Sequence, residues 1–116
     1  MFTLKSRIAF YVPSTDENGN IPIAQHDERS EYISSWFARL FGGSTAVNNV
    51  TGCWIDNDNK LVQESIKIVY SFCSSEDLER HYDEIIKTAV NHCQYWNQES
   101  IAIEINDDLL LIDSDD

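Results

Sequence analysis

Basic residues are scarce in this chain of 116 residues. It contains 8 Lys and Arg against 20 Asp and Glu, which gives a formal net charge of −12 at pH 7. Proteins that bind DNA or RNA through the phosphates need clusters of Lys and Arg, and anionic membranes attract the same residues. The charge therefore argues against both classes of partner, and we expect no direct contact with nucleic acid or with a membrane.

Long apolar runs are missing as well. No stretch approaches the roughly 20 residues that a membrane-spanning helix requires, and the first residues, Met1 to Lys5, lack the layout of a secretion signal. The cysteines, Cys53, Cys73 and Cys93, are odd in number and form no C-x-x-C pair, which is typical of free thiols in a reducing compartment. These absences predict a cytoplasmic protein.

What the chain does have is enough apolar material for one core. Hydrophobic residues make up 42% of the sequence, too many for a disordered protein. The length falls in the usual range of a single domain. We therefore predict one domain over residues 1–113, followed by a short acidic tail at residues 114–116.

The periodicity of the first half changes once. Residues 2–12 alternate between apolar and polar side chains, which predicts a strand. The segment between Pro13 and Pro22 is rich in turn-forming residues and predicts a long loop. From about residue 24 to residue 41 the apolar side chains recur at helical spacing, and Gly42 supplies the left-handed conformation that ends a helix.

The second half predicts a hairpin, a helix and further strands. Residues 44–55 and 60–73 are the two arms of the hairpin, joined by a polar turn. Helical spacing runs from about residue 74 to residue 96, residues 100–105 alternate again, and residues 109–112 form a short last strand. The order β-α-β-β-α-β, with an additional C-terminal strand, predicts an α+β ferredoxin-like fold: a two-layer sandwich with two helices on one face of an antiparallel sheet.

Glu64 is the most unusual single residue of the predicted strands. It shares its parity with Val62 and Ile66, and a carboxylate among apolar neighbours is costly to bury unless it is paired or protonated. Three interpretations stay open. Glu64 can face solvent at the sheet edge or through a bulge, it can anchor a ligand in a pocket between sheet and helices, or it can form a buried ion pair with Arg7 or Arg39.

A ligand site built on Glu64 needs further groups. Trp54 lies beside Gly52 on the preceding strand of the hairpin and is free to stack on a planar ligand or on another chain. Arg7 on the first strand supplies a cation. Glu64, Arg7 and Trp54 are therefore our candidate ligand-binding residues.

Three short motifs in the middle of the chain form a recognisable arrangement. They are Gly43-Ser44-Thr45, Gly52-Cys53-Trp54 and the segment from Glu64 to Lys67. In this order they resemble a family of small bacterial proteins of unknown function with G-x-T, G-x-W and E-x-x-K motifs. The resemblance covers roughly residues 7–105 and implies a strand–helix–hairpin–helix–strand order, but it implies no chemistry.

The sequence contains no recognisable motif for metal binding or nucleophilic catalysis. His81 and His92 lie eleven residues apart on the second helix, about 16 Å along its axis, which is too far for one ion. The run from His26 to Glu28 is most simply a cap at the start of a helix, where acids suit the dipole, and Ser74 with Asp77 is expected to form a capping box for the second helix. We expect no metal, no cofactor and no catalytic residue, and we favour a protein that is not an enzyme.

Acidic residues gather at the end of the chain. Between Glu99 and Asp116 there are seven acids and no base. Closely spaced carboxylates can imitate a phosphate backbone and attract a basic partner. The candidate partner-binding residues are Asp107, Asp108, Asp113, Asp115 and Asp116.

Two functional hypotheses follow from these features. The first is a non-catalytic acidic binding protein, such as an inhibitor or interaction module that engages a basic, nucleic-acid-binding protein surface; small phage anti-defence proteins share this composition. The alternative is a small-molecule or nucleotide-binding protein, or a weak enzyme, whose cleft lies between helices and sheet or at a dimer interface. A basic protein is the expected partner under the first hypothesis, and a homodimer is considered under both.

Overall fold

The structure, a computed structural model, describes all 116 residues. Its elements in chain order are β1 (Ser6–Pro13), β2 (Thr15–Asp16), β3 (Gly19–Asn20), α1 (Ile23–Phe41), β4 (Thr45–Ile55), β5 (Leu61–Cys73), α2 (Ser75–Tyr95), β6 (Ile101–Ile105) and β7 (Asp108–Ile112).

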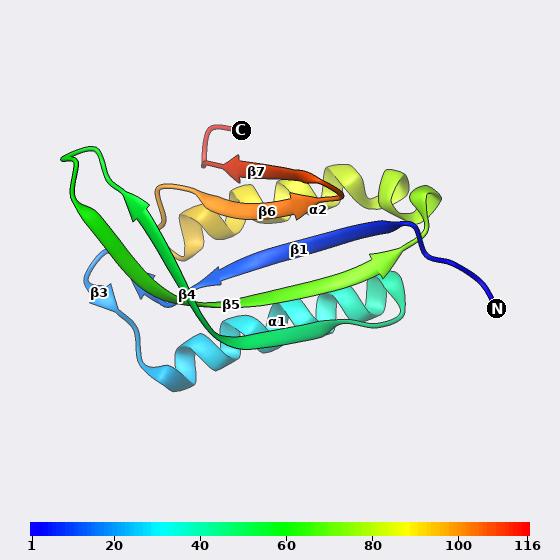
Figure 1. Cartoon of the computed structure of the whole chain (residues 1–116), viewed down its shortest axis with the longest axis horizontal. Helices are drawn as coiled ribbons and strands as arrows, with labels where there is room; N and C mark the ends of the chain where they lie inside the picture. Colours follow the sequence, from blue (N-terminus) through cyan, green and yellow to red (C-terminus); the bar gives the residue numbers. More distant parts are fainter.

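Five of the strands form one antiparallel sheet in the order β4-β5-β1-β6-β7 (Figure 1). The short strands β2 and β3 pair only with each other. Both helices pack on the same face of the sheet, since side chains of α1 and α2 join those of β1 in one buried cluster. The predicted α+β two-layer sandwich, including its additional C-terminal strand, is confirmed.

The register of the central strand decides which residues form the core. Ile8, Phe10 and Val12 of β1 are fully buried under the helices. Phe10 pairs with Val69 of β5 and with Ile103 of β6, and directly paired residues point to the same side of a sheet. The core therefore lies between β1, its two neighbours and the helices.

The more apolar side of β5 does not face the helices. The alternating residues Val62, Ile66, Ile68, Tyr70 and Phe72 are the more apolar set, but Val69 is the residue that pairs with buried Phe10. The apolar set therefore points away from the helices. The predicted first strand also began too early, because β1 begins at Ser6 and Phe2 is exposed.

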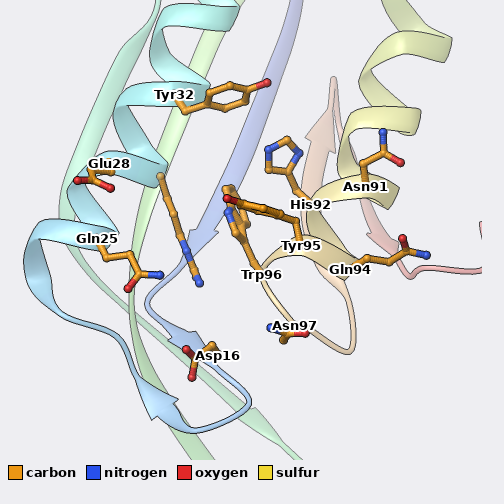
Figure 2. A pocket seen from close by; sticks show the side chains of 11 residues that line it. Asp16, Gln25, Glu28, Tyr32, Asn91, His92, Gln94, Tyr95, Trp96 and Asn97 are labelled. Atoms are coloured by element: carbon orange, nitrogen blue, oxygen red, sulfur yellow. The ribbon is translucent and has the colours of Figure 1, made fainter.

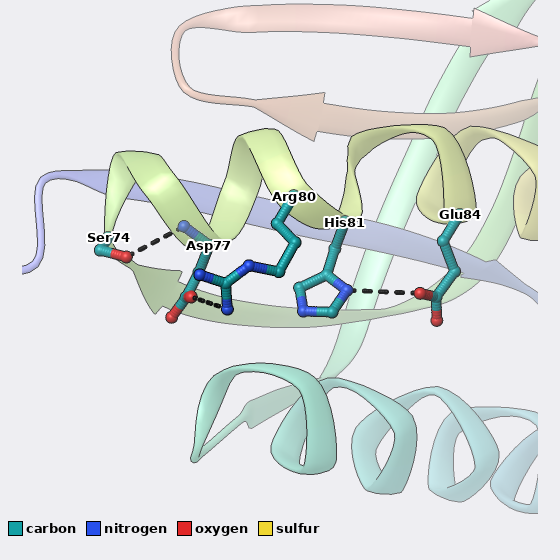
Figure 3. Close-up of polar contacts among 5 residues, drawn as sticks. All are labelled: Ser74, Asp77, Arg80, His81 and Glu84. Carbon is teal, nitrogen blue, oxygen red and sulfur yellow. Dashed lines mark hydrogen bonds and ion pairs between the residues drawn. The ribbon is translucent and has the colours of Figure 1, made fainter.

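The ends of the helices agree only in part with the expected caps. Helix α1 begins after Pro22 with no acid in its first turn and no side-chain cap, so the cap predicted at residues 26–28 was wrong. Asp27 contacts Lys67 instead, with 3.1 Å between Oδ1 and Nζ. Gly42 ends α1 with a φ of 92°, as expected. Ser74 caps α2 by accepting a hydrogen bond from the Asp77 backbone N–H at 3.1 Å (Figure 3).

Neither helix is both long enough and apolar enough to cross a membrane.

Candidate functional site

The side of the sheet opposite the helices, here called the open face, is uncovered and largely apolar. Large hydrophobic side chains on it remain 40–65% exposed: Val47 and Trp54 on β4, Phe72 on β5, and Leu109 and Leu111 on β7. An isolated domain has little use for so many exposed apolar side chains on one face, which are typical of a binding or association face.

Glu64 lies on the open face, in the part of the β4–β5 hairpin that extends past the end of β1. The pairing of β1 with β5 stops at Pro13 and Ile66, while β4 and β5 continue to pair as far as Ile55 and Leu61 (Figure 1). The Glu64 carboxylate fills part of the space beyond the end of β1. It therefore does not lie between the sheet and the helices. The interpretation that placed Glu64 in a pocket there was wrong.

The Glu64 carboxylate is held through one of its two oxygens. Oε1 accepts hydrogen bonds from the Ser14 backbone N–H at 2.9 Å and from the Thr15 hydroxyl at 3.0 Å. Oε2 has no partner in the chain and is available to a ligand. An ionised carboxylate accepts several hydrogen bonds, so this half-used group is a plausible anchor for hydroxyl or amino donors.

Trp54 and Gly52 complete this part of the open face. Gly52 pairs directly with Glu64, and Trp54 follows two residues later on the same side of β4. A Cβ at position 52 would lie 3.5 Å from Ile66 Cδ1 and 4.0 Å from Trp54 Cζ3. Because the glycine has no side chain, no atoms project from position 52 between the Trp54 indole and the Glu64 carboxylate. Trp54 as a whole residue is 45% exposed, and its ring can accept a planar ligand.

The segment that holds Glu64 is itself fixed by a buried cation. Arg29 of α1 is 5% exposed and donates from Nη1 to the carbonyl oxygens of Pro13 and Thr15, both at 2.9 Å. Gln98 adds a bond from Nε2 to the Thr15 carbonyl at 2.7 Å. Burial lowers the pKa of Arg29, and the charges of Asp16 and Glu64 oppose that effect. Thr15 therefore links the two sides of the sheet: its carbonyl accepts from Arg29, and its hydroxyl donates to Glu64.

Lys67, the other end of the E-x-x-K motif, lies on the opposite side of the sheet from Glu64. It pairs with Val12, whose side chain is buried under the helices. Its Nζ contacts Asp27 and also donates to Asn48 Oδ1 at 3.0 Å. The lysine therefore ties α1 to the sheet and takes no part in the surface around Glu64.

The structure does not bring Arg7 to Glu64 and Trp54 within one chain. Arg7 pairs with Phe72, eight residues along β5 from Glu64, which corresponds to about 26 Å. There it donates to Glu104 at 2.8 Å and lies 4.8 Å from the centroid of the Tyr70 ring. An ion pair between Arg7 and Glu64 is thereby excluded within one chain.

Tyr11 joins Arg7 and Glu104 in a polar cluster on the open face, separate from the surface around Glu64. Its hydroxyl donates to Glu104, the carboxylate that also pairs with Arg7. The hydrogen bond to Glu104, followed by burial and by the negative charge of that carboxylate, raises the pKa of Tyr11, while Arg7 opposes the shift.

The predicted partner-binding acids are all exposed. Asp107 and Asp108 lie at the turn between β6 and β7, and Asp113, Asp115 and Asp116 follow β7. None of them forms an ion pair with a base; the tail is ordered instead by hydrogen bonds from the backbone of Asp113 to Asp116 and from that of Asp115 to Asp113. Their charges are thus unneutralised at the surface.

The histidines of α2 have separate surroundings. His81 Nδ1 lies 3.3 Å from Glu84 Oε1, one turn further along the helix (Figure 3). His92 Nδ1 contacts the Thr88 carbonyl at 2.9 Å and packs among aromatic rings. No group of three His, Cys, Asp or Glu side chains is arranged to hold a metal ion.

A large cleft between the helices was not found from the sequence. It has a volume of about 1060 Å³ and lies between the first half of α1 and the end of α2 (Figure 2). Its walls come from segments around residues 16, 25–32 and 91–97, which share no sequence motif. The only signal in the sequence was the pair of aromatic residues at the end of the second predicted helix.

Comparison with known proteins gives structural neighbours only. No family model and no curated protein matches the sequence. A phage SAM lyase in complex with S-methyl-5′-thioadenosine is similar in fold, with a TM-score of 0.66, 15% identity, and coverage of 97% of this chain and 92% of that one. A phage SAM lyase in its apo state gives a TM-score of 0.58 at 16% identity, covering 97% of this chain and 94% of that one.

A third neighbour comes from a different functional setting. The divalent ion tolerance protein CutA1 from Ehrlichia chaffeensis gives a TM-score of 0.52 at 15% identity, covering 89% of this chain and 79% of that one. At such low identities these similarities establish the shared α+β fold and no more. The arrangement of this chain thus occurs both in phage lyases and in a bacterial ion tolerance protein.

Proposed function

We propose that the chain binds S-adenosylmethionine on its open face and cleaves it to S-methyl-5′-thioadenosine. The observation that carries the proposal is Glu64: a carboxylate with one unused oxygen beside the exposed ring of Trp54, on an uncovered sheet face. The fold shared with a phage SAM lyase over nearly the whole length of both chains supports the choice of substrate. This makes specific the small-molecule alternative drawn from the sequence.

The proposed reaction needs little chemistry from the protein. The bond between the sulfonium sulfur and the methionine Cγ breaks, and its electron pair stays on sulfur, which becomes a neutral thioether. A lyase adds no water, so the new bond forms within the substrate. A carboxylate oxygen of the methionine part attacks Cγ as the bond to sulfur breaks, and the four-carbon group leaves as a lactone. The main demand on the protein is to hold the substrate in a reactive conformation.

Glu64 is best suited to anchor parts of the substrate whose charge does not change during the reaction. The sulfonium loses its positive charge as the bond breaks, so a carboxylate beside it would favour the substrate over the transition state. Hydroxyl groups of the ribose do not change in this way and are good donors to Glu64 Oε2. Trp54 offers its ring to the adenine base. The net charge of −12 attracts a cationic substrate.

The proposal includes association of the chain with copies of itself through the open face. Val47, Trp54, Phe72, Leu109 and Leu111 leave an apolar surface that a second copy would cover. Arg7 is too far from Glu64 to join it within one chain, so it reaches the site only if another copy supplies it. Sedimentation at micromolar concentration would reveal a species larger than 13.3 kDa.

Turnover measurements test this function directly. Purified protein is incubated with S-adenosylmethionine, and S-methyl-5′-thioadenosine is quantified by chromatography and mass spectrometry. At substrate concentrations well below KM we expect Glu64→Gln to slow product formation about 100-fold through a higher KM, which corresponds to the loss of one charged hydrogen bond. Glu99→Gln, at an exposed site outside the open face, is the control and should leave the rate unchanged. No product from the folded wild-type protein would refute the proposal.

A second candidate function rests on the exposed acids near β7. We propose that Asp107, Asp108, Asp113, Asp115 and Asp116 form a negative surface that engages a basic, nucleic-acid-binding protein, as the composition of the chain first indicated. Charge-driven binding weakens as salt rises. Capture of candidate basic proteins at low and high salt, with the five residues changed to Asn as the comparison, tests it. An affinity that changes neither with the salt concentration nor with the five substitutions would count against this function.

A further inference from the structure

The cleft between α1 and α2 has aromatic walls that the core does not require. Tyr95 is 80% exposed and Tyr32 is 55% exposed, although both line the cleft. His92 lies between them, with ring centroids 5.2 Å from Tyr32 and 6.2 Å from Tyr95 (Figure 2). An aromatic side chain stabilises a fold mainly through the area it buries, so these open rings are better explained by a flat ligand.

The edges of the cleft carry paired hydrogen-bonding groups. Gln25 on α1 and Asn91, Gln94 and Asn97 at the end of α2 bring carboxamides from both sides. A carboxamide presents a donor and an acceptor side by side. Asn and Gln bind adenine in this way, because the N6 amino group and the N7 atom form the complementary pair.

The charges of the cleft select against phosphate. Asp16 and Glu28 place two carboxylates at its rim. Arg29 is the only Lys or Arg in the lining, but it is 5% exposed and its Nη1 donates to the carbonyl groups of Pro13 and Thr15. The accessible charge is therefore negative, which attracts an amino group and repels a phosphate.

Arg29 also leaves a buried donor unused. Its Nε–H is buried and has no partner in the chain. A buried donor without a partner costs free energy, and such groups are rare in native structures. The side chain packs against the cleft wall, 5.0 Å from the centroid of the Trp96 ring. The cleft thus combines aromatic faces and carboxamide edges, and the buried Arg29 side chain forms part of its wall.

We propose that this cleft binds the purine ring of an unphosphorylated nucleoside of the adenosine type. The ring stacks on Tyr95, a carboxamide pairs with its amino edge, and the carboxylates at the rim exclude nucleotides and nucleic acid strands. This site is distinct from the surface around Glu64. The two lie on opposite sides of the sheet, and the Ser14–Thr15 segment separates them.

Titration with adenosine, followed by calorimetry and by backbone NMR shifts, tests the proposal. We expect saturable binding with shifts at residues 91–97. Tyr95→Ala should weaken it about 10-fold or more, the usual effect of removing a stacking ring. Tyr82→Ala removes another half-exposed tyrosine of α2, one outside the cleft, and should leave the affinity unchanged. AMP should bind at least about 10-fold more weakly than adenosine, and Asp16→Asn should narrow this difference.

Several results would overturn the assignment. They are absence of saturable adenosine binding, equal or tighter binding of AMP, an unchanged affinity in Tyr95→Ala, or binding of choline with the same shifts, which would indicate a cage for cations. Glu64→Gln separates this inference from the proposed lyase. It should slow turnover of S-adenosylmethionine about 100-fold while leaving the adenosine affinity of the cleft intact.

Discussion

The two faces of the sheet are both apolar, but only one of them is covered by the chain. On the helix-covered face, Ile8, Phe10 and Val12 are inaccessible to solvent. On the open face, Phe72 and Trp54 remain about half exposed although they belong to the same sheet. The buried face accounts for stability, and the open face holds an unused carboxylate oxygen and unpaired aromatic surface. Apolar patterning alone therefore does not distinguish a core from a binding surface.

The largest expected difference between the faces concerns two phenylalanines. Phe10→Ala removes a ring packed against Phe37 and Trp96 and should lower the free energy of unfolding by about 3–5 kcal/mol. Phe72→Ala removes a ring that is 50% exposed and should cost less than about 1.5 kcal/mol in the isolated chain. Urea denaturation of both variants at low protein concentration makes the comparison. Equal losses would mean that the open face is buried in solution.

Two arginines provide the next comparison. Arg29→Ala leaves the carbonyl groups of Pro13 and Thr15 without their donor and should cost about 2–4 kcal/mol. Arg7→Ala removes a partly exposed pair with Glu104 and should cost about 1 kcal/mol or less. Thermal and urea unfolding should rank the two variants in this order. A larger loss of stability for Arg7→Ala than for Arg29→Ala would contradict this ranking and would mean that the arginine on the open face stabilises the fold more.

Alkaline pH should act on the open face through Tyr11. The folded-state pKa of this group lies above its ordinary value of 10.0, mainly because its hydroxyl donates to Glu104. Its contribution to stability is therefore complete below 10.0 and is lost as the pH rises through the raised folded-state pKa. Tyr11→Phe should remove this part of the alkaline decline in stability. Unfolding profiles of wild type and variant that stay parallel above pH 10.0 would contradict the assignment.

The smallest effect concerns the cysteines and leaves stability unchanged. Cys53 on β4 is exposed, whereas Cys73 and Cys93 are buried on the helix-covered side, where burial raises the pKa of both thiols. Alkylation of the native protein should therefore modify one thiol rapidly and two slowly, since the thiolate is the reactive form. Cys53→Ser should abolish the fast phase. Two fast thiols in the wild type would show that the helix layer opens readily.

The order of the two helices and of the five strands of the main sheet could be predicted from the sequence because each has a clear period. The β2–β3 pair was missed, since it lies where a long loop was expected and each strand has only two residues. The α2 helix and its Ser74 cap follow from apolar spacing and local hydrogen-bonding chemistry, and Gly42 marks the end of α1 for steric reasons. The side of β5 that faces the helices was not accessible. Both alternations of this strand contain apolar residues, and only the pairing of Phe10 with Val69 decides between them.

The candidate site could be predicted only in part for the same reason. Glu64 stood out because a carboxylate among apolar residues is costly, and Trp54 followed from its place in the hairpin. The separation of Arg7 from Glu64 depends on the register of β1 on β5, which no local pattern encodes. The cleft between the helices combines three distant segments and depends entirely on how the helices pack.

A crystal structure of the protein with S-methyl-5′-thioadenosine tests the central claim most directly. The account predicts ordered ligand on the open face, with a ribose hydroxyl in hydrogen-bonding contact with Glu64 Oε2 and the adenine against Trp54. Ligand found only in the cleft between α1 and α2, with the surface around Glu64 empty or occupied by unrelated contacts, would contradict it.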